Sequence, residues 1–193
     1  TGVIGERGCG VTELHPTSER VIKIGTLSKA LGAQGGFVCA SRRVIDYLVN
    51  RGRPYIFSTA LAPPIAAAAL RAIQIVQEEP ERREHLSRLA SLLRNRLIEQ
   101  GWDIGASQSH IIPVIVGESS RSLDLSSHLE KAGLLVPAIR PPSVPSDSSR
   151  LRISLTAGHT IDDIEQLLLF ATREKSCEKR TGSTTTSSPS TTS

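Results

Sequence analysis

The sequence predicts an α/β fold followed by a smaller α+β part. Short β-branched runs alternate with helical segments over the first part of the chain, the order expected of an α/β domain. Residues 151–155 alternate apolar and polar side chains, as a half-buried strand does, and an amphipathic helix pattern follows them. Hydrophobic residues make up 38% of the 193-residue chain and aromatic residues only 3%, which suits aliphatic helices packed on a sheet.

The first part opens with a glycine-rich loop, residues 1–10, where glycines permit positive φ and close backbone approach. Strand, helix and turn signals then follow in order. They predict strands at 21–24 and 36–40, a helix capped by Ser41, an extended segment at 55–59 and a helix at 65–79. The last helix is apolar nearly all round, so we expect it to be deeply buried.

The second part begins near residue 78, where charged residues start to separate the leucines. Its predicted elements are helices at 81–100 and 123–131, strands at 110–116, 134–136 and 151–155, and a helix after Thr160. Pro113 lies inside a strand, which predicts an edge position or a bulge. Thr160 and Asp163 have the spacing of a capping box.

The resulting division is a domain at 1–77, a domain at 78–172, and a Ser/Thr-rich tail at 173–193 that we expect to be disordered. The chain starts with Thr and contains no Met, so we expect it to be the C-terminal part of a longer protein.

Composition argues against several classes of function. The net charge of +4 is spread among acids with no basic block, which argues against nucleic-acid binding. No apolar run is long enough to span a membrane. The three cysteines have neither zinc-site nor disulfide spacing, so we expect no metal and a reducing cytoplasm.

Lys29 is the main candidate for chemistry. It follows a predicted strand and a glycine, and hydroxyls at Thr26 and Ser28 precede it. A nucleophilic lysine must lose its proton near neutral pH, and hydroxyls with free backbone N–H groups can hold a phosphate. The alternative is an ordinary loop lysine, with both hydroxyls capping a turn.

Residues 26–32, Thr-Leu-Ser-Lys-Ala-Leu-Gly, resemble the lysine motif of the α-oxoamine synthases, which are fold-type-I enzymes dependent on pyridoxal phosphate (PLP). Further segments resemble the same family in the same order. These segments are residues 1–10, 57–63, 138–145 and 150–160. The resemblance covers residues 1 to about 172 and implies the end of the large PLP-binding α/β domain followed by the small α+β domain.

The resemblance also implies roles for individual residues. Lys29 matches the lysine that holds PLP as a Schiff base and moves the substrate Cα proton. The other matched positions are phosphate contacts at Thr26 and Ser28, phosphate contacts across a homodimer at Ser58 and Thr59, and amino-acid contacts at Arg140 and Ser143. The family usually has Thr where this chain has Ser143. Simpler alternatives are a helix cap for Ser58 and Thr59 and a surface position for Arg140.

The two C-terminal segments are similar to the branch that condenses L-alanine with a pimeloyl thioester of CoA or acyl carrier protein. That reaction releases CO₂ and gives 8-amino-7-oxononanoate for biotin synthesis. The alternatives are another α-oxoamine synthase, such as glycine C-acetyltransferase, or a non-catalytic remnant that only dimerises. The resemblance places the acidic partner of the cofactor ring upstream of Thr1, so we expect the 193-residue chain alone to be inactive.

Overall fold

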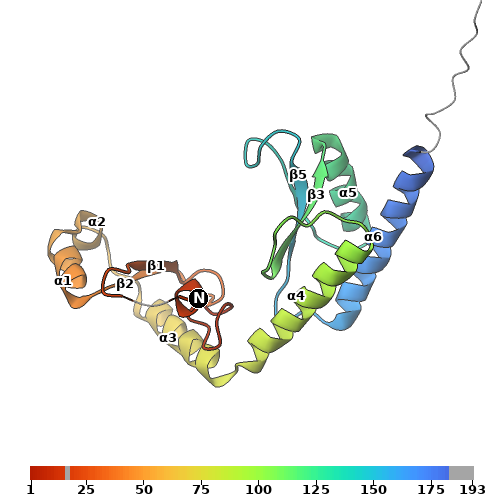
Figure 1. The fold of residues 1–193 in the computed structure, drawn as a ribbon. Helices are drawn as coiled ribbons and strands as arrows, with labels where there is room; N and C mark the ends of the chain where they lie inside the picture. Colours follow the sequence, from red (N-terminus) through yellow and green to blue (C-terminus); the bar gives the residue numbers. More distant parts are fainter. Residues whose placement is uncertain (16–17, 183–193) are drawn as a thin grey trace, which may run out of the picture. The chain divides into compact units, whose positions relative to one another are not determined.

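A computed structural model describes residues 1–15 and 18–182, and the chain divides into two compact units, Thr1–Glu84 and His85–Ser193 (Figure 1). The division lies inside a helix, α4 (Glu81–Glu99). The predicted domain ranges 1–77 and 78–172 stay predictions. No helix among the described residues is long and apolar enough to cross a membrane.

The first unit is built on a two-stranded antiparallel sheet. Strand β1 (Lys23–Thr26) pairs with β2 (Gly36–Cys39) so that Thr26 lies opposite Gly36. The other elements are a short 3-10 helix η1 (Val11–Glu13) and helices α1 (Arg42–Arg51), α2 (Arg53–Ile56) and α3 (Pro63–Glu78). The turn after β1 packs on α3 through a small buried cluster, Leu27, Leu31, Ala33 and Ala69.

Two predictions for the first unit are wrong. Residues 55 and 56 are helical in α2 rather than extended, because Pro54 is tolerated in a helical first turn. The helix predicted at 65–79 is present as α3, but it is not deeply buried. Only Ala69 of its residues is buried, whereas Leu70 and Ile73 are 60% and 41% exposed.

The second unit is a three-stranded antiparallel sheet with helices packed on it. Its order is β3 (Ile111–Gly117), β5 (Ser149–Ser154), β4 (Ala138–Ile139). Helices α5 (Ser119–Lys131) and α6 (Ile161–Gly182) lie on the same side of β3 and β5 (Figure 1). The core contains side chains from both layers, among them Leu93, Leu97, Ile112, Leu129, Leu151 and Ile164.

The edge position predicted from Pro113 is confirmed. Strand β3 is the outer strand of the sheet, and Pro113 lies opposite Arg152. The amide of Arg152 donates to the carbonyl of Pro137, on the opposite side from β3. Pro113 therefore occupies a position whose missing N–H breaks no bond of the ladder.

The predicted strand at 134–136 is absent, and pairing begins at Ala138 instead. The carbonyl of Val136 accepts a hydrogen bond from the Ser126 hydroxyl at 2.7 Å, so a side chain of α5 occupies this acceptor of the predicted strand.

The predicted disordered tail starts too early. Helix α6 continues through residues 173–182, where Arg, Glu and Lys are good helix formers. The Ser176 hydroxyl donates to the carbonyl of Thr172 at 2.9 Å, which is compatible with a continuing helix. Residues 183–193 of the predicted tail lie outside the described residues.

Candidate functional site at Lys29

The turn that carries Lys29 is held by backbone hydrogen bonds on both sides. The amide of Leu27 donates to the carbonyl of Gly35, and the amide of Ala33 donates to that of Leu27, both at 2.9 Å. The amide of Gly32 closes a tighter turn by donating to Lys29 at 2.9 Å. Because Leu27 and Leu31 are buried beneath the turn, Lys29 and Ser28 face outward from a fixed backbone.

Two hydroxyls lie side by side at the start of this turn. The Oγ atoms of Thr26 and Ser28 are 2.6 Å apart, and the amide of Ser28 donates to the Thr26 hydroxyl at 3.1 Å. The structure therefore brings Thr26, Ser28 and Lys29 together in one short segment, as the sequence predicts. Both hydroxyls are exposed and can turn to an anion.

Lys29 lines an open hollow of about 410 Å³ in the first unit. This volume lies within the ~300–1,000 Å³ typical of small-molecule sites. The side of β1 and the glycine-rich loop form the rest of its wall, with Gly10, Lys23 and Thr26 among the lining residues. The Lys29 side chain is exposed and makes no hydrogen bond or ion pair with any described residue, so its amine is available to a ligand.

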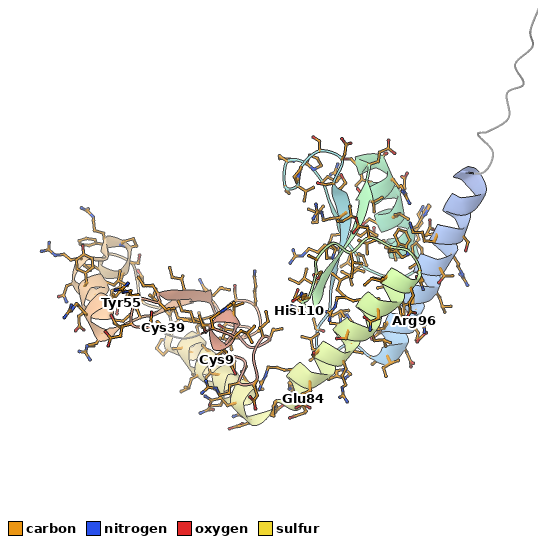
Figure 2. All side chains as sticks on the ribbon, in the orientation of Figure 1. Cys9, Cys39, Tyr55, Glu84, Arg96 and His110 are labelled. Atoms are coloured by element: carbon orange, nitrogen blue, oxygen red, sulfur yellow. The ribbon has the colours of Figure 1, made fainter. Side chains whose placement is uncertain are left out.

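Sequence reasoning missed Lys23 and Glu13. Lys23 lines the same hollow as Lys29, and its ammonium donates to the carbonyl of Cys9. Glu13 accepts hydrogen bonds from the amides of Arg7 and Cys9 (Figure 2 labels Cys9). Both interactions join a side chain to a backbone group of the loop. Such contacts leave no periodic pattern in a sequence, although the density of glycines before Glu13 is a signal that the loop needs special support.

Ser58 and Thr59 lie in the exposed segment between α2 and α3. Neither makes a side-chain hydrogen bond among the described residues. The alternative, in which they cap α3, is not observed, because the residue at the N-terminal cap is Ala62. The two hydroxyls are therefore open to a ligand or to another chain.

Arg140 and Ser143 belong to the second unit, and Lys29 belongs to the first. They bound a turn in which the Ser143 amide donates to the Arg140 carbonyl at 3.0 Å and the peptide bond from Pro141 to Pro142 is cis. Both side chains are exposed, and within the described part of the chain Arg140 has no acidic partner. Its guanidinium is free to receive a carboxylate.

The described residues contain no cluster of metal ligands. Among the residues that the structure describes, no group of three or more His, Cys, Asp or Glu could hold a metal ion. The side chains that line the hollow include the amines of Lys23 and Lys29 and the hydroxyl of Thr26.

The site has a lysine after a strand, beside paired hydroxyls and a glycine-rich loop. Comparison with known families identifies the class of protein to which such a site belongs. The family described as aminotransferase class I and II matches residues 2–169, and the chain belongs to this family. One curated relative, 8-amino-7-oxononanoate synthase of Cupriavidus necator, is 47% identical over 174 residues. The match covers 86% of this chain and 43% of the relative, so the chain spans less than half of that protein.

Solved structures share the fold. Serine palmitoyltransferase of Sphingomonas wittichii matches with a TM-score of 0.84 and 33% identity, over 94% of this chain and 46% of that one. 8-Amino-7-oxononanoate synthase of Francisella tularensis matches with a TM-score of 0.82 and 26% identity, over 92% of this chain and 53% of that one. These matches confirm the predicted α/β class.

Proposed function

We propose that this chain provides the lysine-bearing part of an 8-amino-7-oxononanoate synthase. The observation that carries the proposal is Lys29, which lines a ligand-sized hollow together with Thr26, whose hydroxyl pairs with that of Ser28. The family match and the 47% identity to a relative of that name support the specific reaction. The reaction joins L-alanine to a pimeloyl thioester and releases CO₂.

The residues at the hollow fit PLP. A primary amine without an ionic partner among the described residues can bond the cofactor aldehyde, and the paired, exposed hydroxyls suit its phosphate. Lys29 is the residue that would hold the aldehyde, and Thr26 and Ser28 would hold the phosphate. When bound, PLP supplies an electron sink for the amino acid.

Side chains of this protein carry out the other steps of the proposed reaction. Arg140 pairs with the alanine carboxylate through its planar guanidinium, which fixes the orientation of the substrate. Ser143 lies next to it in the same turn and donates a hydrogen bond to the substrate. The Lys29 amine takes the proton from the alanine Cα and later returns one to the product.

The proposal includes a homodimer, because Ser58 and Thr59 are exposed and make no side-chain hydrogen bond among the described residues. In a dimer, their hydroxyls would help to hold the cofactor phosphate of the partner subunit. We also assign the protein to the cytoplasm, where the exposed free thiols of Cys9 and Cys39 stay reduced. The acyl donor is pimeloyl-CoA or pimeloyl-acyl carrier protein.

A chimera tests the reaction. Residues 2–169 replace the matching segment of the Cupriavidus necator relative, and product formation from L-alanine and pimeloyl-CoA is measured by mass spectrometry. We expect turnover that Lys29→Ala reduces by at least about a thousandfold, since loss of a covalent catalyst removes the main route. Lys131→Ala, on the exposed end of α5, is the matched control and should keep full activity. A chimera that folds and binds PLP without forming product would refute the proposal.

A second candidate reaction, between L-serine and palmitoyl-CoA, has support from the match to serine palmitoyltransferase. The same chimera assayed with L-serine and palmitoyl-CoA, and with glycine and acetyl-CoA, separates the two alternatives. We expect L-alanine with pimeloyl-CoA to be preferred, because the identity to the Cupriavidus necator relative is 47% against 33% for serine palmitoyltransferase.

A further inference from the structure

The glycine-rich loop beside the Lys29 hollow is folded around one carboxylate. Glu13 accepts a hydrogen bond from the amide of Arg7 at 2.8 Å through one oxygen, and from the amide of Cys9 at 2.9 Å through the other. Its side chain is only 11% exposed, although the loop itself lies on the surface. One carboxylate thus satisfies two backbone donors that no strand or helix would satisfy.

The loop can wrap this carboxylate because Gly5 has no side chain. Gly5 has a φ of 91°, and a Cβ atom there would lie 2.3 Å from an oxygen of Glu13. Two backbone bonds close the loop around it, from the Gly10 amide to Ile4 at 2.8 Å and from the Gly2 amide to Gly8 at 2.7 Å. The glycines of this segment therefore allow one fixed loop conformation, in which the backbone surrounds the Glu13 carboxylate.

Cys9 connects this loop to the hollow. Glu13 accepts a hydrogen bond from the Cys9 amide, and the Lys23 ammonium donates one to the Cys9 carbonyl. The two side chains therefore both bind the backbone of Cys9. Gly10, the next residue, is buried, and a Cβ there would lie 3.9 Å from Lys23 Nζ. Gly10 and Lys23 both line the hollow that Lys29 faces.

We propose that Glu13 and Lys23 are a coupled pair of positioning residues for the Lys29 hollow. Glu13 fixes the backbone at Cys9, and Cys9 fixes the Lys23 ammonium on the hollow wall. The result is a second positive charge beside Lys29, in a site that receives an anionic ligand. This inference deepens the proposed function and rests on it.

The electrostatics of Glu13 agree with this role. The hydrogen bond from the Arg7 amide, with that from Cys9 and the charge of Arg7, holds the pKa of the Glu13 carboxyl below its usual value. Glu13 is therefore charged at neutral pH and accepts both bonds. In that state Glu13 binds the amides of both Arg7 and Cys9 and fixes the loop.

A double-mutant cycle on the 193-residue chain tests the inference. The chain is treated with limiting PLP and then with borohydride, and modification at Lys29 is compared with that at Lys131 by peptide mass spectrometry. The exposed Lys131 is an internal reference for unselective reaction. We expect Lys29 to be preferred in the unmodified sequence.

Glu13→Gln and Lys23→Met should each lower that preference by about tenfold, and the double variant should lower it no further, because both act through Cys9. Lys23→Arg, which keeps the charge and the donor, should retain most of the preference. Glu6→Gln is the matched control, since Glu6 lies in the same loop with an exposed side chain.

The coupling would be overturned if the fold-losses in Lys29 preference of the two single variants multiplied in the double variant. It would also be overturned if Glu13→Gln kept the same preference as Glu6→Gln. Melting temperatures are measured for every variant, and amide exchange at Cys9 in Glu13→Gln reports the loop without any ligand. Exchange at Cys9 that stays as slow as in the unmodified chain would also refute the role of Glu13. An inactive chimera would instead count against the proposed reaction, so the two failures are distinguishable.

Discussion

Gly25 is a single residue on which the position of Lys29 depends. It lies in β1, opposite Phe37 on β2, and a Cβ atom there would approach the ring of Phe37 to 2.3 Å. Phe37 in turn packs against the buried cluster under the Lys29 turn. Any side chain at Gly25 would therefore displace Phe37 and disturb the buried cluster under the Lys29 turn.

Gly25→Ala should destabilise the protein by about 1–3 kcal/mol, the usual cost of overpacking, as measured by urea unfolding. Adding Phe37→Leu should recover part of that loss, because the smaller side chain vacates the space. Gly158→Ala is the control, since its Cβ would meet only the Thr156 hydroxyl, at 3.6 Å. Equal stability of Gly25→Ala and the unmodified protein would show that the ring moves freely.

At the residue scale, the sequence was sufficient for the Lys29 turn and insufficient for its surroundings. Thr26, Ser28 and Lys29 are consecutive or nearly so, and the structure brings them together because they share one turn. Glu13 and Lys23 act through the backbone of Cys9, which lies four residues before Glu13 and 14 residues before Lys23. Their contacts become visible only when the loop conformation is known.

At the scale of elements, helices with a clear apolar face were predicted well. The helix predicted at 81–100 is observed as Glu81–Glu99, with Leu86, Leu89, Leu93 and Leu97 buried. Short strands were harder to predict. The strand predicted at 21–24 begins at Lys23, and Val21 and Ile22 are left exposed. A run of four β-branched or apolar residues does not determine where pairing starts, because pairing depends on the partner strand.

Helix α6 begins at a capping box. The predicted capping box is confirmed: Asp163 accepts from the Thr160 amide at 2.7 Å, and the Thr160 hydroxyl accepts from the Asp163 amide at 3.2 Å. The bonds from the Thr160 amide and hydroxyl, with a smaller contribution from the charge of His159, hold the pKa of Asp163 below its usual value.

A carboxyl with a lowered pKa in the folded state stabilises the protein above its unfolded pKa. That stabilisation is lost as the pH falls through the folded pKa. Asp163→Asn should therefore lower the melting temperature at neutral pH, and the difference from the unmodified protein should shrink as the solution becomes strongly acidic. Asp162→Asn, a neighbouring exposed acid in the same first turn, should show a smaller effect. A difference that does not depend on pH would contradict this assignment.

At the scale of the whole molecule, the fold class was predictable because alternating strands and helices indicate it before any site is known. The grouping of site residues was less predictable. The sequence resemblance assigns Lys29 and Arg140 to one active site, whereas the structure places them in separate compact units. Side chains from two units can share a site only through long-range packing, which no local pattern encodes.

We expect the 193 residues to carry only part of the activity. The chain spans 43% of the Cupriavidus necator relative, and the described residues at the hollow supply two amines and hydroxyls but no acidic group to pair with the cofactor ring. Without that pairing the electron sink is weak, because a neutral ring withdraws less charge from the substrate. We therefore expect the chain by itself to bind PLP at Lys29 yet form no 8-amino-7-oxononanoate from L-alanine and pimeloyl-CoA, while the chimera forms it. Product made by the chain alone, and abolished by Lys29→Ala, would contradict this expectation and would mean that the hollow already contains everything that the reaction needs.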